Sequence, residues 1–261
     1  MTALERRVAT DAARAAGQML RSEVRGVRRI AYKGTPTNLV TEMDARAEAL
    51  ILERLGQAFP DDAILSEETG SHPGRSGRRW IIDPLDGTTN YAHGLPIFAV
   101  SIALEVERRV TVGVVYDPNM DELFSAERGA GAWLGDTRLA VSATPVLDEA
   151  LLATGFPYNI RETRDTNLPE YAAFSLRARA VRRLGSAVLY LSWLAAGRLD
   201  GYWELRVGAW DVAAGSLFVE EAGGRVTDLR GGPLDLDAPS LVATNGRIHE
   251  AMLGVLGEIR R

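Results

Sequence analysis

One stretch constrains this chain more than any other, because it ends an apolar strand in two carboxylates three positions apart. It reads Trp80-Ile81-Ile82-Asp83-Pro84-Leu85-Asp86-Gly87-Thr88-Thr89-Asn90. Pro84 fixes its own φ and keeps Asp83 out of the α region, while Gly87 permits a tight reversal. We therefore expect both carboxylates and the Leu85 carbonyl to face one side. Such hard oxygen ligands are typical of a site for Mg²⁺ or Mn²⁺ rather than zinc or copper.

The same stretch also fits an ordinary Pro-containing turn, with Asp at its first position and Gly at its last. Two further acidic segments favour the metal site. Glu67-Glu68 follows the apolar run Ala63-Ile64-Leu65 and so lies at a second predicted strand end, although such a pair alone is usually solvated surface. Asp211, in Trp210-Asp211-Val212-Ala213-Ala214-Gly215, lies where a helix is expected to begin, and alone it would be a simple N-cap.

In this order, the three segments resemble the motifs of the inositol monophosphatase family: a Glu-Glu pair, a Trp-Ile-Ile-Asp-Pro-x-Asp-Gly-Thr-Thr-Asn stretch and a Trp-Asp-x-Ala-Ala-Gly stretch. The resemblance covers nearly the whole chain. Further matches are Asn38-Leu39-Val40-Thr41-Glu42-Met43-Asp44, Gly185-Ser186-Ala187 and Asp200-Gly201-Tyr202-Trp203-Glu204. One departure concerns the basic residue that many bacterial relatives carry two positions before Trp-Asp. This chain has Gly208-Ala209 before Trp210 and its nearest arginine at Arg206, which leaves the substrate preference open.

Composition agrees with an enzyme that buries a large core. The chain has 261 residues, 46% of them hydrophobic, and no cysteine, which excludes disulfides, thiolate catalysis and a Cys-based zinc site. Charged residues interrupt the apolar positions of residues 1–24, unlike a signal peptide, and no stretch approaches the roughly 20 apolar residues of a membrane span. We therefore expect a cytoplasmic protein without a membrane contact. A net charge of −5 without a long basic block does not favour direct nucleic-acid binding.

Hydrophobic periodicity predicts mixed α and β structure. Two helices are expected first, over residues 4–20 and, after an N-cap at Thr41, over 47–58. The polar segment 26–38 between them is expected to form a mobile loop or loose hairpin beside the site. The strands expected next are 98–107, 111–116, 122–126 and 132–139. The later strands expected are 150–154, 178–183 and 241–244, and the later helices are 186–196, 211–222 and 248–259.

Because the pattern changes near Pro145, we expect two lobes and no flexible linker. Residues 1–145 would form an α+β lobe with an antiparallel sheet and most metal ligands. Residues 146–261 would form an α/β lobe with the substrate wall and one metal ligand. Periodicity alone gives no finer architecture, but the resemblance implies a five-layer αβαβα sandwich of the inositol monophosphatase and fructose-1,6-bisphosphatase type.

Charge repulsion among the acidic residues means that cations must bind before a phosphate dianion. The resemblance implies two or three Mg²⁺ ions, with Mn²⁺ as an alternative. It assigns Glu67, Asp83 and the Leu85 carbonyl to one ion, and Asp83, Asp86 and Asp211 to a second. It also implies that Thr88, oriented by Asp44, positions the attacking water, and that the Gly87 and Thr88 amides receive phosphate oxygens. Two plainer roles stay open, a helix cap for Asp44 and a turn hydroxyl for Thr88.

The residues expected to contact the rest of the substrate are Gly185, Ser186, Ala187, Glu204 and Asp211. Ser186 would open a helix, whose free amides attract anions or hydroxyl oxygens, although Gly-Ser before a helix is also routine capping. Glu204 would accept hydrogen bonds from polyol hydroxyls, or be a charge at a strand end. Lys33 would reach the phosphate from its loop, or remain solvated. The three histidines, His72, His93 and His249, are expected to be structural or exposed.

Together, the motifs and the resemblance predict a Mg²⁺-dependent, lithium-sensitive phosphomonoesterase that hydrolyses inositol-1-phosphate. The resemblance also predicts a homodimer. The same chemistry on fructose-1,6-bisphosphate, histidinol phosphate or a 3′-phosphonucleotide is the first alternative. A regulatory protein that contacts RNA polymerase is the second, which the resemblance implies but no motif supports. Because every catalytic position of the family is retained, a purely non-enzymatic role is disfavoured.

Overall fold

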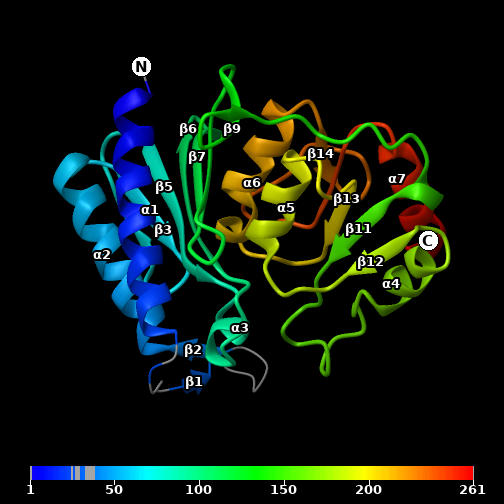
Figure 1. The fold of residues 1–261 in the computed structure, drawn as a ribbon, viewed down its shortest axis with the longest axis horizontal. Coiled ribbons are helices and arrows are strands. Elements are labelled where there is room, and N and C mark those ends of the chain that lie inside the picture. The colour runs from blue at the N-terminus through cyan, green and yellow to red at the C-terminus, as the bar shows by residue number, and fades with distance from the viewer. Residues whose placement is uncertain (1, 25, 27–29, 33–38, 261) are drawn as a thin grey trace.

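A computed structural model of the protein describes residues 2–24, 26, 30–32 and 39–260. Helices and sheets alternate across the molecule in five layers, from the helix pair α1 and α2 to the pair α4 and α7 (Figure 1). The αβαβα sandwich predicted from the family resemblance is therefore confirmed. Among the described residues, none of the helices combines the length and apolar character that a membrane crossing requires.

The first layer consists of α1 (Ala3–Glu23) and α2 (Glu42–Ala58), which pack against each other and against the large sheet. Small residues on α1 permit a close approach, since a Cβ added to Gly17 would lie 2.5 Å from Tyr116 Cδ1. Helix α2 begins at the predicted N-cap, where the Thr41 hydroxyl accepts from the Met43 amide at 3.2 Å. The Asp44 carboxylate accepts from the Thr41 amide at 2.8 Å and so completes a capping box.

The second layer is an eight-stranded sheet with the order β10-β9-β8-β7-β6-β5-β3-β4. Its strands are β3 (Ala63–Ser66), β4 (Gly70–His72), β5 (Arg78–Asp86), β6 (Ala99–Val106), β7 (Arg109–Asp117), β8 (Glu122–Glu127), β9 (Gly131–Leu134) and β10 (Thr137–Arg138). Strand β3 runs parallel to β5, and the other neighbours are antiparallel. The single strand expected over 132–139 is wrong, because Gly135, at φ 56°, turns the chain between β9 and β10.

The middle layer consists of α5 (Ala187–Ala195) and α6 (Ala209–Glu221), which lie between the two sheets (Figure 1). Residues 212–219 of α6 are all buried, as expected for a helix that is covered on every side. A Cβ on Gly113 of β7 would lie 3.1 Å from Ala214 Cα, so the glycine permits a close helix-to-sheet contact. Helix α6 begins two residues before the predicted start at Asp211, and Gly208 is its N-cap.

The fourth layer is a five-stranded sheet with the order β12-β11-β13-β15-β14. Its strands are β11 (Leu151–Thr154), β12 (Ala180–Arg182), β13 (Gly201–Glu204), β14 (Arg225–Asp228) and β15 (Leu241–Thr244). Strand β11 runs parallel to β12 and β13, and the other pairs are antiparallel. The outer layer, α4 (Leu168–Ser175) and α7 (His249–Ile259), covers this sheet. The sequence pattern does not predict α4 and β14, which are only eight and four residues long.

The two sheets divide the chain between β10 and β11, with a 3₁₀ turn (Leu147–Glu149) in the connection. Helices α5 and α6 belong by sequence to the second half, yet α6 packs on β7 and α5 on β6. One apolar cluster includes Ile81 of β5 together with Leu191 of α5 and Phe218 of α6. The halves therefore share a core, and a lobe boundary at residue 145 stays a prediction.

Candidate active site

A bulge in β5 brings the two aspartates of the central motif to one side. Side chains of a regular strand alternate, so residues three apart face opposite ways. The pairing of β5 with β6 shifts after Asp83, which pairs with Ser101, so that Asp86 pairs with Ala99. Pro84, which cannot donate to the ladder, lies within this bulge. The plain Pro-containing turn is thus wrong, because the strand continues to Asp86.

Gly87 ends the strand with a backbone that another residue would not adopt easily. Its φ is 90°, and an added Cβ would lie 2.7 Å from the Ile97 carbonyl oxygen. The short helix α3 (Thr88–Ala92) starts directly after it. This turn places Thr88 beside Asp44 of α2, whose Oδ1 accepts from the Thr88 hydroxyl at 2.9 Å. The hydroxyl is also 3.0 Å from the Leu85 carbonyl oxygen.

Glu67 approaches from the neighbouring strand. Strand β3 runs beside β5, and the Glu67 amide donates to the Ile82 carbonyl at 3.2 Å. Asp211 comes from the other side, in the first turn of α6, where its carboxylate accepts from the Gly208 amide at 2.6 Å. The end of the large sheet and the start of a middle-layer helix therefore supply the acidic residues together.

Asp83, Asp86 and Asp211 form a compact group in which each offers a carboxylate oxygen within 4.8 Å of the others. Asp83 is 1% exposed, and among the described residues its Oδ2 has no hydrogen-bond partner. Its Oδ1 accepts from the Leu85 amide at 3.0 Å. Glu67 lies outside this tight group but lines the same pocket as Asp86 and Asp211.

The pKa values of these carboxyls show how unfavourable their joint ionisation is. Burial, followed by the charge of Glu67, raises the pKa of Asp83 well above its ordinary value. The same causes raise the pKa of Asp211 well above its ordinary value. Burial raises the pKa of Asp86 to about 7, although hydrogen bonds from Ser186 and Val188 oppose the change. Such a group binds protons or cations in preference to remaining bare.

The donor set fits a hard divalent cation. Three clustered carboxylates, a buried carboxylate oxygen that no donor of the described residues reaches and a nearby backbone carbonyl are oxygen ligands of the kind that Mg²⁺ and Mn²⁺ prefer. Neither sulfur nor imidazole belongs to the group. The acidic cluster therefore qualifies as a metal site by its chemistry.

Asp86 links this cluster to the predicted Gly-Ser-Ala turn. Its Oδ2 accepts from the Ser186 hydroxyl and, at 3.0 Å, from the Val188 amide. Ser186 is the N-cap of α5, with its hydroxyl also accepting from the Leu189 amide at 3.2 Å. The predicted helix start is confirmed, and the free amides of α5 face an aspartate of the cluster.

Asn90, the last residue of the central motif, holds the same turn in place. Its Nδ2 donates to the Leu184 carbonyl at 2.7 Å and to the Ile97 carbonyl at 2.9 Å. The Tyr190 hydroxyl accepts from the Gly185 amide at 2.8 Å from the opposite side. Gly185 has a φ of 84°, and an added Cβ would lie 3.0 Å from the Asn90 amide nitrogen.

A pocket of about 200 Å³ lies over the acidic cluster. Its lining includes most predicted site residues: Glu67, Asp86, Gly185, Ser186, Ala187, Glu204 and Asp211. Burial raises the pKa of Glu204 to about 7, although a hydrogen bond from the Tyr202 hydroxyl opposes the change. Gly155 leaves room for this carboxylate, since a Cβ there would lie 1.9 Å from Glu204 Oε1. Asp83 and Thr88 do not line the pocket. Asp83 lies beside the lining residues Asp86 and Asp211, and the Thr88 hydroxyl is bonded to the Leu85 carbonyl, next to Asp86.

Several lining residues are not predicted from the sequence: Phe156, Pro157, Tyr158, Arg183 and Tyr190. Most lie in segments without a distinctive motif, and only chain folding brings them to the pocket. Lys33, the expected loop contact, lies outside the described residues. Strands β1 (Ile30–Tyr32) and β2 (Leu39–Thr41) on either side of it pair antiparallel, which agrees with a hairpin.

Gly208, which stands where many bacterial relatives carry a basic residue, is packed closely against Trp210. A Cβ on Gly208 would lie 2.4 Å from Trp210 Cε2, so a longer side chain there requires the indole to move. Arg206 lines the pocket instead and occupies the left-handed region at φ 54°. The arginine nearest the Trp-Asp motif therefore approaches the pocket from a different position.

The fold and the site define a class of phosphatases that use a carboxylate cluster between two sheets. Residues 4–261 match the profile of the inositol monophosphatase family, and the chain belongs to this family. It is similar to an inositol-1-monophosphatase of Synechocystis, with 47% identity over 94% of this chain and 86% of the relative. It is also similar to a protein of Salmonella typhimurium called Nus factor SuhB, with 42% identity over 94% of this chain and 93% of the relative.

A solved structure supports the same assignment. The inositol monophosphatase of Anabaena superposes with a TM-score of 0.90 at 42% identity, covering 98% of this chain and 96% of that one. This similarity extends across both sheets and all helical layers. The family membership predicted from the motifs is thereby confirmed.

Proposed function

We propose that this protein is a Mg²⁺-dependent phosphomonoesterase that hydrolyses inositol-1-phosphate to inositol and phosphate. The observation that carries the proposal is Oδ2 of Asp83, which has no hydrogen-bond partner in the part of the chain that the structure describes and is buried in a group of three carboxylates below a pocket of about 200 Å³. A pocket of this size suits a small polar ester. The names of the Synechocystis and Anabaena relatives support the same substrate.

The residues that would hold the metals are those of the acidic cluster. Glu67, Asp83 and the Leu85 carbonyl would hold one ion, while Asp83, Asp86 and Asp211 would hold a second. Bound Mg²⁺ would neutralise the carboxylates, acidify a water molecule and stabilise the leaving alkoxide. Asp83 is central in this assignment because it would serve both ions.

Thr88 is suited to orient the attacking water. Asp44 accepts the Thr88 hydroxyl proton in a hydrogen bond of 2.9 Å, which leaves the threonine oxygen free to accept from a water. Asp44 is itself held by the Thr41 amide and hydroxyl at 2.8 and 2.6 Å. Water would attack phosphorus as the bond to the inositol oxygen breaks, with no covalent enzyme intermediate, and the Gly87 and Thr88 amides would receive phosphate oxygens.

The polyol would occupy the side of the pocket lined by Ser186, Glu204 and Asp211. Carboxylates there would accept hydrogen bonds from vicinal hydroxyls and disfavour a second phosphate. Monoesters of polyols should therefore be better substrates than bisphosphates. Arg206, at the rim, is the residue through which fructose-1,6-bisphosphate or a 3′-phosphonucleotide would be favoured instead.

Phosphate release from a substrate panel tests the proposal. The panel contains inositol-1-phosphate, fructose-1,6-bisphosphate, histidinol phosphate and a 3′-phosphonucleotide, each assayed with Mg²⁺, Mn²⁺, Ca²⁺ or EDTA. We expect the highest kcat/KM with inositol-1-phosphate and Mg²⁺, little turnover with Ca²⁺ and none with EDTA, because Ca²⁺ accepts longer bonds and more ligands. We also expect inhibition by lithium. Full activity in EDTA would refute the metal mechanism, and a preference for another ester would refute the substrate.

A second role is suggested by the relatives called Nus factor SuhB. We propose that this protein, as a homodimer, could combine catalysis with a contact to the transcription machinery. Co-purification with RNA polymerase tests this contact, and light scattering tests the dimer. Binding to polymerase by a catalytically inactive variant would separate the two roles.

A further inference from the structure

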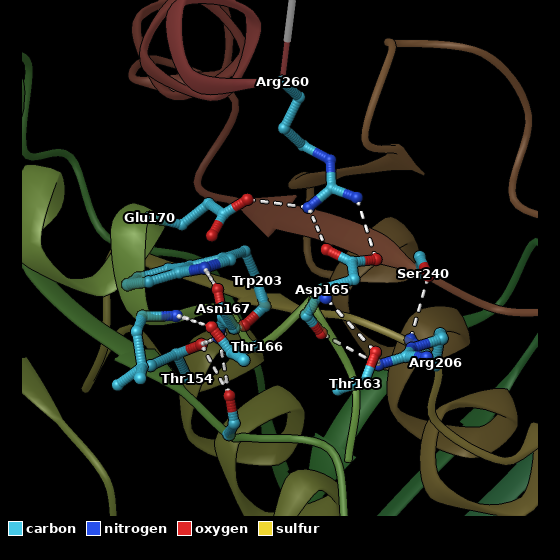
Figure 2. A network of polar contacts seen from close by, with 12 residues as sticks. Thr154, Thr163, Asp165, Thr166, Asn167, Glu170, Trp203, Arg206, Ser240 and Arg260 are labelled. Carbon is cyan, nitrogen blue, oxygen red and sulfur yellow. Dashed lines mark hydrogen bonds and ion pairs between the residues drawn. The ribbon is translucent and has the colours of Figure 1, made fainter. Parts of the chain in front are cut away.

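A loop of residues 155–167 forms one side of the substrate pocket, and its two ends are clamped together. Asn167, which is fully buried, donates from Nδ2 to Thr154 Oγ1 at 2.8 Å and to the Gly155 carbonyl at 2.6 Å (Figure 2). The indole N–H of Trp203 donates to Asn167 Oδ1 at 2.7 Å. Residues 155–158 line the pocket directly. The base of the loop is therefore rigid, and the position of its middle depends on other contacts.

Arg206, which also lines the pocket, reaches the middle of this loop. Its Nη2 donates to Thr163 Oγ1 at 3.0 Å and to the Asp165 carbonyl at 2.8 Å (Figure 2). Its own amide donates to Ser240 Oγ at 2.9 Å. These contacts connect the segment after β13 with the loop across the pocket edge.

The backbone of Arg206 makes these contacts in a conformation that favours glycine. Its φ is 54°, in the left-handed region where a Cβ is costly. Strain of this kind persists only where surrounding contacts over-determine it, and it is concentrated at functional sites. The contacts of the Arg206 side chain and amide therefore oppose a local backbone preference.

Arg260, at the end of α7, holds the same loop from outside. Its Nη1 and Nη2 donate to the two carboxylate oxygens of Asp165 at 3.0 and 3.1 Å (Figure 2). Its Nη1 also donates to Glu170 of α4 at 2.7 Å. Asp165 is thus bound by one arginine through its carbonyl and by another through its carboxylate.

We propose that Arg206 is a positioning residue that holds residues 155–167 as the outer wall of the substrate pocket and so lowers the KM for the polyol phosphate. The proposal rests on the phosphatase function proposed above. Without the tether, the loop would sample open positions, and substrate binding would have to order it. The chemical step, which depends on the carboxylates below, would proceed at a similar rate once substrate is bound.

The variant Arg206→Gly tests the tether without a risk to folding, because glycine adopts a φ of 54° without strain. We expect an unchanged or higher Tm. The KM for inositol-1-phosphate should rise about tenfold, since two charge-assisted hydrogen bonds are lost, while kcat changes less than about twofold. Hydrogen exchange should accelerate at the loop amides of Ile160, Glu162 and Thr163, which donate to carbonyls within the loop.

Arg108→Gly is a matched control. Arg108 also lies in the left-handed region, at φ 60°, and its guanidinium pairs with Asp237 at 2.9 Å. It lies in the turn between β6 and β7, beyond Val106, whereas Ala99 at the other end of β6 pairs with Asp86. The same substitution on the same backbone should therefore leave the KM and the exchange of residues 155–167 unchanged.

Thr163→Val separates a tether from a direct contact with substrate. Thr163 does not line the pocket, and the change removes an acceptor of Arg206 and of the Asp165 amide, at 3.0 and 3.2 Å, without altering any charge. A raised KM and faster loop exchange in this variant would support the tether. A raised KM in Arg206→Gly without faster exchange of residues 155–167 would mean that Arg206 acts on substrate directly, which would overturn the proposal.

The exchange measurement also keeps this proposal distinct from the proposed function. If the wild-type protein hydrolysed no polyol phosphate, the proposed function would fail. The comparison of Arg206→Gly with Arg108→Gly by hydrogen exchange needs no substrate, and equal protection of residues 155–167 in both would refute the tether by itself.

Discussion

The two sides of the pocket are built in opposite ways. The carboxylate side comes from a strand bulge and the first turn of a buried helix, and Asp83 there is 1% exposed. The opposite wall comes from the loop of residues 155–167 and the segment after β13, and Tyr158 there is 57% exposed. Regular, buried elements hold functional groups in more precise positions than loops do. The carboxylate side therefore suits the chemical step, and the wall suits substrate selection.

This difference has a consequence for mutations. Changes on the carboxylate side should lower turnover with every ester, because in the proposed mechanism every substrate uses the same metals and water. Changes on the wall should alter the ranking of substrates and leave a hydroxyl-poor ester less affected. The following predictions test this division, from the largest expected effect to the smallest.

The largest effect is expected for Asp83→Asn. Because Asp83 is proposed to serve both metals, the loss of its charge should lower kcat/KM at least about a thousandfold with inositol-1-phosphate and with p-nitrophenyl phosphate. The fold should persist, since the change relieves repulsion within the metal-free cluster. The Mg²⁺-induced rise in Tm should also be lost.

The control for this variant is Asp148→Asn, which changes an exposed aspartate in the 3₁₀ turn. It should retain wild-type kinetics and the full Tm response to Mg²⁺. Near-normal Mg²⁺-dependent turnover in Asp83→Asn would remove the central ligand from the proposed mechanism. A loss confined to inositol-1-phosphate would contradict the division between the two sides.

His249 tests the packing behind the wall. It is fully buried, with its ring nitrogens 3.0 Å from Thr227 Oγ1 and 2.9 Å from Thr244 Oγ1. Burial, followed by the charge of Arg225, lowers its pKa from 6.5 to about 4, while Glu250 opposes the change. Between these values the unfolded chain binds a proton that the folded protein excludes. The histidine therefore costs no stability above about pH 6.5. As the pH drops to 4, the free energy of unfolding should fall by up to about 3 kcal/mol.

Urea unfolding from pH 4 to 7 measures this effect against His249→Asn, which does not titrate. Other groups, including Glu204, titrate in both proteins, so the difference between the two curves isolates the histidine. We expect wild type to lose more stability than the variant in this window. Parallel curves would show that His249 remains neutral in both states or is hydrated in the folded protein.

Glu204→Gln tests the wall itself. The carboxylate lines the pocket and accepts from the Tyr202 hydroxyl, so it is oriented toward one position. Losing the charge-assisted hydrogen bonds that Glu204 is proposed to make with substrate should lower kcat/KM for inositol-1-phosphate roughly tenfold to a hundredfold. The kcat/KM for p-nitrophenyl phosphate should change much less. An equal loss with both esters would place Glu204 in the chemical step rather than in selection.

The smallest effect is expected at the junction of the two sides, for Ser186→Ala. The hydroxyl caps α5 through the Leu189 amide and also donates to Asp86. Its removal should cost about 1 kcal/mol of unfolding free energy. We also expect a few-fold fall in kcat, because Asp86 keeps its bond from the Val188 amide at 3.0 Å.

Chemical denaturation and steady-state assays measure both consequences. Ser192→Ala in the same helix is the control, since its buried hydroxyl donates to the Val188 carbonyl of its own helix at 2.9 Å. That change should leave kcat unaltered. If both variants behaved alike, the junction between α5 and the acidic cluster would have no special role.

Much of the carboxylate side could be predicted from the sequence, because its acidic residues lie in short motifs with a local cause. Pro84 and Gly87 indicate an irregular strand end, and Thr41 with Asp44 indicates a capped helix. The fold class followed from the resemblance of these motifs to a family, since periodicity indicated only mixed α and β. Short polar elements such as β14 gave no such signal.

The sequence by itself determined which residues would carry charge at strand and helix ends, because backbone conformation there depends on Pro, Gly and capping side chains close along the chain. Only the tertiary structure decided that Arg206 bonds to Asp165, 41 positions away, and that Arg260 bonds to it from 95 positions away. These contacts depend on how the layers stack, since loop ends distant in sequence meet only after two sheets and their helices have packed. The carboxylates are thus encoded locally, whereas the wall that faces them is a product of the whole fold.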